Sequence, residues 1–414
     1  MTDQTPVRAG MTLPSSRRAL LRSCAAVAMT VLCWTTGAGA TEPAGSSPAR
    51  PGQDWPAFLG PTGDAVSSET GIRTDWSEGL PLVWQRTLGE GYCMGSVSDG
   101  RFFVFDRAGD EARLSALDAA TGRELWRSPY PSRYEDYYGY SSGPRASPVV
   151  DGDRVYTYGV EGRLRCLRAD DGSLVWEVDT TARFGVVQNF FGAGSSPVIE
   201  GDLLVAMVGG SPPDSPRIHT GEVEGNGTGL VAFDKRTGKV RWTLSDELAS
   251  YSTPRIVTMH GRRRGFAFTR GGLLGFDPAR GSEDFFFPWR ARKLESVNAS
   301  SPVVVDDTVL VSESYGPGGI LLRIPPSGEP AVVWRDGRRN QSLQTHWSTP
   351  VYHEGFVYAS SGQGSGDAEL RCLEHGTGEV KWAEPGLARS TLLLVDGHLV
   401  VLTEYGKLLL VRPN

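Results

Sequence analysis

Short apolar runs recur along the whole chain, and each is interrupted by glycine, aspartate or proline. No long stretch places its apolar residues at the spacing of an amphipathic helix. Runs such as 154–158 are instead bounded by turn residues, here Asp151-Gly152-Asp153. This pattern predicts many short strands joined by tight turns, and therefore an all-β protein. The 52 glycines of the 414-residue chain fit the same interpretation.

One turn motif returns along the chain. In its full copies a glycine follows an acidic residue, and a tryptophan follows the glycine by four residues. The carboxylate can accept backbone N–H bonds within the turn, and the glycine supplies a positive φ. The tryptophan is then placed to wedge between neighbouring units. The motif residues are Asp118, Gly122 and Trp126; Gly172 and Trp176; Asp234, Gly238 and Trp242; and Gly378 and Trp382.

The spacing of the motif predicts a β-propeller. Successive motif glycines, with degraded copies at Gly281 and Gly328, lie 43 to 66 residues apart, as four-stranded blades require. A second marker, Ser-Pro or Thr-Pro, opens an apolar strand ahead of the turn, as at Ser196-Pro197 and Thr253-Pro254. Counting blades gives seven, and eight is the alternative if residues 50–80 add strands.

The two ends of the chain predict how the ring closes. Residues 391–411 supply three strands, and residues 81–85, which include Trp84, match a fourth. An N-terminal strand that joins the C-terminal blade would leave no open edge between the first and last blades. We therefore expect the propeller to span 81–414. Residues 41–80 form a linker and N-terminal extension that packs across the propeller through Trp55, Phe58 and Trp76.

Residues 1–40 have the pattern of an export signal. Arg17 and Arg18 precede a short apolar stretch, and Ala38-Gly39-Ala40 is a cleavage pattern. The apolar stretch is too short to anchor the chain in a bilayer, so we expect no transmembrane anchor. The arginine pair leaves twin-arginine export and general secretion both open. Either route places the protein in the periplasm or outside the cell.

Charge and cysteine content narrow the possible partners. Residues 1–40 contain four arginines and one aspartate, so the remainder has 38 Lys and Arg against 47 Asp and Glu. An acidic chain argues against nucleic acid as a partner. Cys93, Cys166 and Cys372 form no adjacent pair, and we interpret them as buried small hydrophobic residues. We expect a monomer.

The turn motif, together with Asp54-Trp55-Pro56 near the start of the repeats, resembles the pyrroloquinoline-quinone (PQQ) repeat family. That family includes quinoprotein dehydrogenases and the propeller subunit of the outer-membrane protein assembly machinery. The resemblance covers most of residues 54–412 and implies the propeller fold. The repeats form blade structure and do not touch a quinone. The resemblance also implies that a dehydrogenase would carry a vicinal disulfide and often a C-x-x-C-H haem site, both of which this sequence lacks. The sequence does not exclude a calcium site, but no aspartate-rich loop indicates one. We assign no cofactor, no metal and no catalytic residue.

Candidate binding residues lie in loops that lead from the outer strand of one blade to the inner strand of the next. These loops rim one end of the central channel, where polar and aromatic groups could form a pocket. The alternative is that they satisfy backbone groups and line a water-filled channel. His346 is the single candidate for a general base, and a packed rim residue is the competing interpretation. The candidate rim residues are Tyr140, Arg145, Asn189, Tyr251, Asn298, His346, Trp347 and Arg389.

The sequence therefore favours an exported, non-enzymatic propeller scaffold that binds a protein or a glycan on its loop face. The alternative is a quinoprotein-like dehydrogenase that acts on alcohols or sugars. The insertion at 209–229 is either a partner-binding loop or a mobile excursion.

Overall fold

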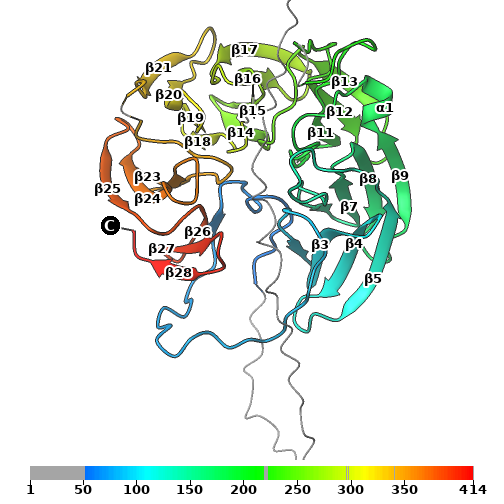
Figure 1. The fold of residues 1–414 in the computed structure, drawn as a ribbon, viewed down its shortest axis with the longest axis horizontal. Helices are drawn as coiled ribbons and strands as arrows, with labels where there is room; N and C mark the ends of the chain where they lie inside the picture. The colour runs from blue at the N-terminus through cyan, green and yellow to red at the C-terminus, as the bar shows by residue number, and fades with distance from the viewer. Residues whose placement is uncertain (1–51, 219–221, 295, 297, 340, 414) are drawn as a thin grey trace, which may run out of the picture. The chain divides into compact units, whose positions relative to one another are not determined.

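The computed structural model describes residues 52–218, 222–294, 296, 298–339 and 341–413. Within these residues, the strands form seven four-stranded sheets, and the only helix, α1 (Thr180–Phe184), has five residues. Figure 1 shows the sheets around a common centre, with the chain passing from blade to blade. The predicted all-β propeller of seven blades is confirmed. The export signal predicted for residues 1–40 lies outside the described residues.

Blades 1 to 6 share one strand order, from a short inner strand to a longer outer strand. All neighbouring strands within these blades are antiparallel. The strands of blades 1 to 3 are β2 (Ser96–Ser98), β3 (Arg101–Ala108), β4 (Glu111–Asp118) and β5 (Glu124–Pro131); β6 (Val149–Asp151), β7 (Arg154–Tyr158), β8 (Arg163–Arg168) and β9 (Leu174–Asp179); and β10 (Val198–Glu200), β11 (Leu203–Met207), β12 (Leu230–Asp234) and β13 (Val240–Leu244). The strands of blades 4 to 6 are β14 (Arg255–Met259), β15 (Arg262–Phe268), β16 (Gly272–Asp277) and β17 (Ser282–Pro288); β18 (Val303–Val305), β19 (Thr308–Glu313), β20 (Gly318–Arg323) and β21 (Ala331–Arg335); and β22 (Val351–His353), β23 (Phe356–Ser361), β24 (Glu369–Glu374) and β25 (Val380–Glu384).

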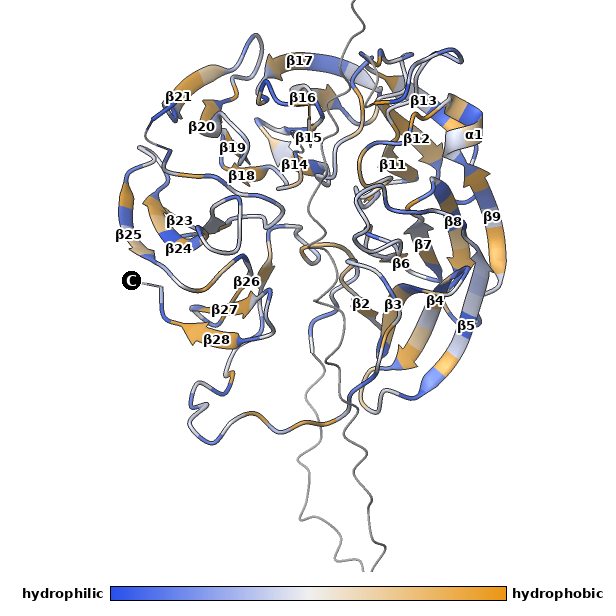
Figure 2. Cartoon of the chain, in the orientation of Figure 1, coloured by the Kyte–Doolittle hydropathy of each residue, from blue (hydrophilic) through white to orange (hydrophobic). Residues whose placement is uncertain are grey.

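The position of a strand in its blade explains its sequence. The middle strands are covered on both faces by neighbouring blades, so apolar residues fill most of their buried positions, and the first four residues of β12 are all buried. Outer strands face solvent on one side and alternate polar with apolar residues. Figure 2 shows this contrast between β11 and β12, which are mainly apolar, and β9 and β25, which are mixed.

The turn motif locks each blade to the next. The indole Nε1 of Trp126 donates a hydrogen bond to the carbonyl oxygen of Ala169 at 3.0 Å, and that of Trp176 donates to Lys235 at 3.0 Å. Each ring lies over the motif glycine of the following blade, Gly172 or Gly238. Trp84, Trp242 and Trp334 repeat the arrangement on Ala119, Pro278 and His375.

Within the turns, the acidic side chain is a local acceptor. Asp118 accepts hydrogen bonds from the backbone N–H and the hydroxyl of Thr121, at 2.9 and 2.7 Å. Asp234 does the same for Thr237. Trp382, in the last full motif, packs with its ring 6.0 Å from that of Tyr358 in its own blade.

The Ser-Pro and Thr-Pro markers form a belt of hydrogen bonds around the channel. The hydroxyl of each marker accepts a bond from the backbone N–H at the same position in the preceding blade. The bonds run from Ser147 to Ser196 (2.9 Å), Ser196 to Thr253 (3.1 Å), Thr253 to Ser301 (3.0 Å) and Ser301 to Thr349 (3.0 Å). The marker thus joins inner strands that do not pair with one another.

Blade 7 contains the N-terminal strand. Its order is β1 (Val66–Ser67), β26 (Ser390–Val395), β27 (His398–Thr403) and β28 (Leu408–Val411), with β1 parallel to β26. An N-terminal strand therefore joins the C-terminal blade, as predicted, but on its inner side.

The strand predicted at 81–85 was wrong, because these residues pair with no strand of the described chain. Leu82 and Val83 are 72% and 78% exposed. Trp84 still takes the place of an outer-strand tryptophan, because its indole donates to Ala119 of the next blade at 3.0 Å, but β28 has no outer partner among the described strands.

Candidate functional site

The connections from outer to inner strands gather on one end of the channel, which we call the loop face. It consists of residues 132–148, 180–197, 245–254, 289–294, 296, 298–302, 336–339, 341–350 and 385–389, together with Tyr92, whose backbone N–H donates to Pro144. All eight predicted rim residues lie on it. They form two clusters, one from blades 1 to 4 and one from blades 5 to 7.

Arg145 organises the first cluster. Its Nη2 lies 2.7 Å from Oδ2 of Asp136, whose side chain is fully buried. The guanidinium carbon lies 5.6 Å from the ring centres of Tyr92 and Tyr134 and 5.9 Å from that of Phe191. A buried ion pair surrounded by rings holds these loops in one arrangement.

Tyr251 and Asn298 join the loops of blades 2 to 4. The Tyr251 hydroxyl accepts a hydrogen bond from the backbone N–H of Phe191 at 2.9 Å, and burial raises the pKa of Tyr251. The carbonyl oxygen of Asn298 accepts from the Tyr251 backbone, and its Nδ2 donates to the carbonyl of Thr269 at 2.7 Å. These two rim residues are therefore fixed supports of the face.

His346 is central to the second cluster. Its Nε2 lies 2.9 Å from the hydroxyl of Tyr315, and its ring stacks on Trp347 at 4.3 Å between centres. The guanidinium carbon of Arg389 lies 4.1 Å from the ring centre of Trp347, and Arg389 forms an ion pair with Glu404 at 2.6 Å. Burial, with the nearby charge of Arg389, lowers the pKa of His346 to about 4. The imidazole is thus neutral at pH 7 and a weak base.

Tyr315 connects the two clusters, because it packs against the buried group that also contains Phe190, Phe191 and Tyr251. Around this base several large aromatic side chains remain exposed. Their exposed fractions are 61% for Tyr92, 63% for Tyr137, 44% for Tyr138, 67% for Tyr140 and 46% for Trp347. The loop face therefore has a packed base, and exposed aromatic side chains form its surface.

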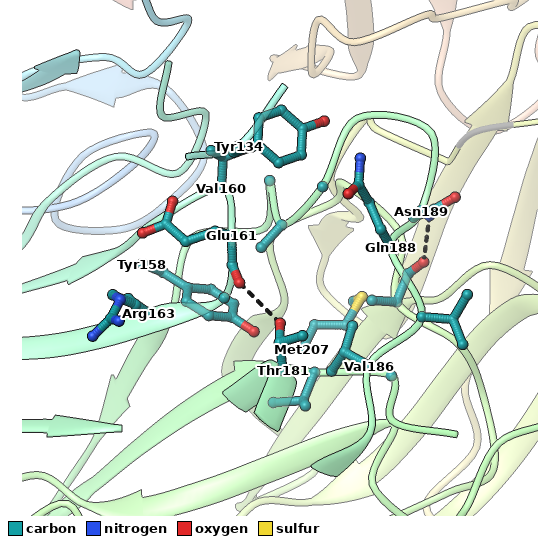
Figure 3. A pocket seen from close by; sticks show the side chains of 18 of the residues that line it. Tyr134, Tyr158, Val160, Glu161, Arg163, Thr181, Val186, Gln188, Asn189 and Met207 are labelled. Carbon is teal, nitrogen blue, oxygen red and sulfur yellow. Dashed lines mark hydrogen bonds between the residues drawn. The ribbon is translucent and has the colours of Figure 1, made fainter. Parts of the chain in front are cut away.

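A cavity of about 620 Å³ opens beside the first cluster, between blades 2 and 3. Figure 3 shows Met207 and Val186 on one side of it and Gln188 and Asn189 on another. The short helix α1 contributes to the wall, and Asp179 caps it by accepting from the backbone of Ala182. The described part of the 209–229 insertion adds two aliphatic side chains, Ile218 and Val223.

Two features of this cavity had no signal in the sequence. Arg270 lies in the hairpin between β15 and β16, within a blade, so the outer-to-inner loops do not include it. Tyr134 is buried and its hydroxyl has no partner among the described residues. The sequence pointed to this cavity only through Asn189, which lies beside Gln188 in a predicted rim loop.

A calcium ion beside a quinone would need several oxygen ligands close together. No group of three or more His, Cys, Asp or Glu side chains lies together in the described part of the chain. Cys166 and Cys372 are buried in separate clusters, and burial raises the pKa of Cys93 and of Cys166 to about 12. We derive no chemical step through such a group. Within the same residues, no helix is long and apolar enough to cross a bilayer.

Comparison with known proteins gives partial matches to enzymes. The chain is 26% identical over 151 residues to quinohemoprotein alcohol dehydrogenase ADH IIB of Pseudomonas putida, covering 35% of this chain and 20% of that protein. It is 31% identical over 137 residues to the dehydrogenase subunit of the quinone alcohol dehydrogenase of Gluconobacter oxydans (strain 621H), covering 32% and 16%. The match thus spans a fifth or less of these relatives.

A solved structure and a family model extend over most of the chain. The crystal structure of BamB from Moraxella catarrhalis superposes with a TM-score of 0.53 at 20% identity, covering 78% of this chain and 83% of that one, which shows the shared fold. The family model described as outer membrane protein assembly factor BamB matches residues 64–210, 110–316 and 287–414. These matches confirm the predicted resemblance to PQQ-repeat propellers, and the chain belongs to the family of outer membrane protein assembly factor BamB.

Proposed function

We propose that this protein is an exported, non-enzymatic scaffold that binds a protein partner through the loop face. The observation that carries the proposal is the group of exposed aromatic side chains at the rim: Tyr92, Tyr137, Tyr138, Tyr140 and Trp347. Tyrosine and tryptophan are enriched where proteins bind one another, because they bury a large area with few rotatable bonds.

The packing beneath these side chains supports the same function. Tyr138 stacks on Phe190 at 6.0 Å and Tyr140 lies 6.1 Å from Phe191, while Arg145 holds the loop that carries both tyrosines. A surface already held in one arrangement loses little conformational entropy on binding. The family name, which refers to outer membrane protein assembly, also favours a protein partner in the cell envelope. The export pattern at residues 1–40 is consistent with that location.

Co-purification from cross-linked envelope extracts tests the proposal. We expect Tyr137→Ala/Tyr140→Ala to lose most of the partner protein recovered with the wild type. The matched control is Leu174→Ala/Val175→Ala, which removes two exposed apolar side chains (51% and 39%) from β9, away from the loop face. Equal recovery with both double variants would contradict a role for the rim.

Two further measurements separate the competing functions. Purified protein mixed with PQQ and calcium should show neither a quinone absorbance change nor dye-linked oxidation of alcohols, and turnover would overturn the scaffold proposal. If the wild type binds immobilised glycans and the tyrosine variant does not, the partner is a carbohydrate and not a protein.

A further inference from the structure

The cavity on the loop face contains a buried cation that forms no ion pair with a carboxylate of the described residues. Arg270 is 7% exposed and lines the cavity. Its Nη1 donates to Oδ1 of Asn189 at 3.1 Å, and its Nη2 donates to the carbonyl oxygen of Leu294 at 3.2 Å. Both acceptors are neutral, and within the described residues Arg270 forms no ion pair. A buried charge without a counter-charge is costly and rare in folded proteins.

A second arginine strengthens the positive charge at this point. Arg290 donates to the same carbonyl oxygen of Leu294 at 3.3 Å, so the two guanidinium groups lie next to each other. The buried Nε of Arg290 has no hydrogen-bond partner among the described residues. Glu247 and Glu313 attract Arg290 only from a distance. Burial and this neighbouring cation lower the pKa of Arg270 to about 10, so Arg270 remains charged at pH 7.

No other cation of the cavity wall is buried without an ion pair in the described chain. Arg163 pairs with Glu177, and Asp179 caps α1. Glu161 accepts a hydrogen bond from Ser132 through Oε2, while its buried Oε1 has no partner among the described residues. Arg133 is exposed at the edge. Arg270 is therefore the buried wall cation whose charge is uncompensated in the described chain.

The rest of the wall is suited to an apolar body. Aliphatic side chains dominate it, and its volume of about 620 Å³ lies in the range of small-molecule sites. The aliphatic lining residues include Val186, Val187, Met207, Val208, Ile218 and Leu248.

We propose that this cavity binds a monocarboxylate that carries an aliphatic or aromatic body. The carboxylate would pair with the guanidinium of Arg270, a geometry in which two parallel N–H···O bonds form. Asn189 holds that guanidinium in place, and Met207 and Val186 contact the body. A ligand with several negative charges fits less well, because Glu161 and Asp179 line the same wall.

Calorimetric titration of the full mature chain tests this site with a matched pair of probes, 4-phenylbutanoate and the neutral 4-phenylbutanamide. We expect the acid to bind at least about tenfold more tightly than the amide, since a hydrogen-bonded charge pair supplies that difference. Arg270→Met should lower the affinity for the acid by a similar factor and leave the amide unchanged. The control Arg323→Met removes an exposed cation of β20 and should change neither affinity.

The wild-type ratio of acid to amide keeps the test valid even if Arg270→Met disturbs the fold, which circular dichroism would report. Equal affinities, no binding of either probe at millimolar concentration, or an unchanged affinity in folded Arg270→Met would overturn the proposal.

A second probe pair identifies the source of the carboxylate. Acetyl-Ala-Ala-Leu and its C-terminal amide are titrated beside the small acids. If the peptide acid binds more tightly, the natural ligand is the C-terminal carboxylate of a protein partner. If 4-phenylbutanoate binds more tightly, the ligand is a free small acid. Both outcomes support a carboxylate site. The proposal does not depend on the scaffold function. The co-purification test uses the tyrosine variants, which leave Arg270 intact, so the outcome of that test and the outcome of the titrations can be told apart.

Discussion

At the scale of single residues, two neighbouring serines show how a hydroxyl group can join blades. Ser196 accepts the backbone N–H of Ser147 at 2.9 Å, whereas the hydroxyl of Ser195 has no protein partner in the described chain. Both serines are almost fully buried. We expect Ser196→Ala to reduce the free energy of unfolding by about 1–3 kcal/mol, because it leaves a buried N–H without an acceptor.

Ser195→Ala is the matched control, and we expect it to change stability by less than about 0.5 kcal/mol, since it removes a hydroxyl that makes no bond to the protein. Chemical denaturation of both variants measures the difference. Equal destabilisation by the two substitutions would show that the belt does not stabilise the ring.

His346 gives a pH-dependent prediction at the same scale. Its pKa is about 4 in the folded protein and 6.5 for an ordinary histidine. As the pH falls below 6.5, the unfolded chain takes up the proton first, so folding stability decreases toward pH 4. Between pH 7 and pH 4.5 we expect the wild type to lose about 2 kcal/mol more than His346→Gln. Urea titrations at both pH values measure this, and parallel losses would contradict a buried neutral imidazole.

The candidate site was only partly predictable from single residues. The repeat topology was sufficient to place His346, Arg145 and Asn189 on one face, because each follows an outer strand. It did not indicate that Arg145 would be paired with a buried Asp136, or that Arg270 would reach the cavity from a hairpin within its own blade. Such contacts join positions far apart in the chain, and no periodic pattern encodes them.

At the scale of structural elements, the contact between glycine and tryptophan sets the packing of adjacent blades. Gly238 has φ +69°, and a Cβ atom there would lie 2.8 Å from the ring of Trp176. Gly152 has φ +57° in a hairpin turn, and nothing lies within 4 Å of its Cβ position. The two glycines therefore share a left-handed backbone and differ in their surroundings.

We expect Gly152→Ala to cost about 1 kcal/mol, from the left-handed backbone alone. Gly238→Ala should cost about 2–4 kcal/mol, because the methyl group must also displace the indole. Denaturation midpoints and the fluorescence of the tryptophans measure the comparison. Similar midpoints for the two variants would mean that the indole moves without cost.

The prediction of strands was correct where a local motif repeats. It failed at the closure of the ring, which depends on contacts between segments far apart in the chain. The turn and the Ser-Pro marker each appear several times, so their spacing was sufficient to count seven blades. The segment around Trp84 has the pattern of a strand, but a pattern does not show whether a partner edge is within reach. β1 has only two residues, Val66 and Ser67, which is too short for any periodicity to reveal.

At the scale of the whole molecule, residues 55–67 connect blades that are distant in the ring. The backbone N–H of Val97 in blade 1 donates to Trp55 at 2.9 Å, and that of Val150 in blade 2 donates to Pro56 at 2.7 Å. In blade 7 the N–H of Leu394 donates to Ala65 at 2.9 Å. Arg255 of blade 4 also donates to the carbonyl oxygen of Thr62. This segment thus holds the first and last blades together from the inside, while β28 has no outer partner among the described strands.

Deletion of residues 52–67 tests this form of ring closure. The amides of Val97, Val150 and Leu394 would lose their acceptors, so we expect their hydrogen exchange to become faster by about tenfold or more, together with a lower denaturation midpoint. The amides of Ser147 and Ser301 belong to the belt and keep their acceptors, so their protection should fall only as far as global stability does. Unchanged exchange at Leu394 in the deletion variant would show that the ring stays closed without β1, through contacts between blades 7 and 1 alone.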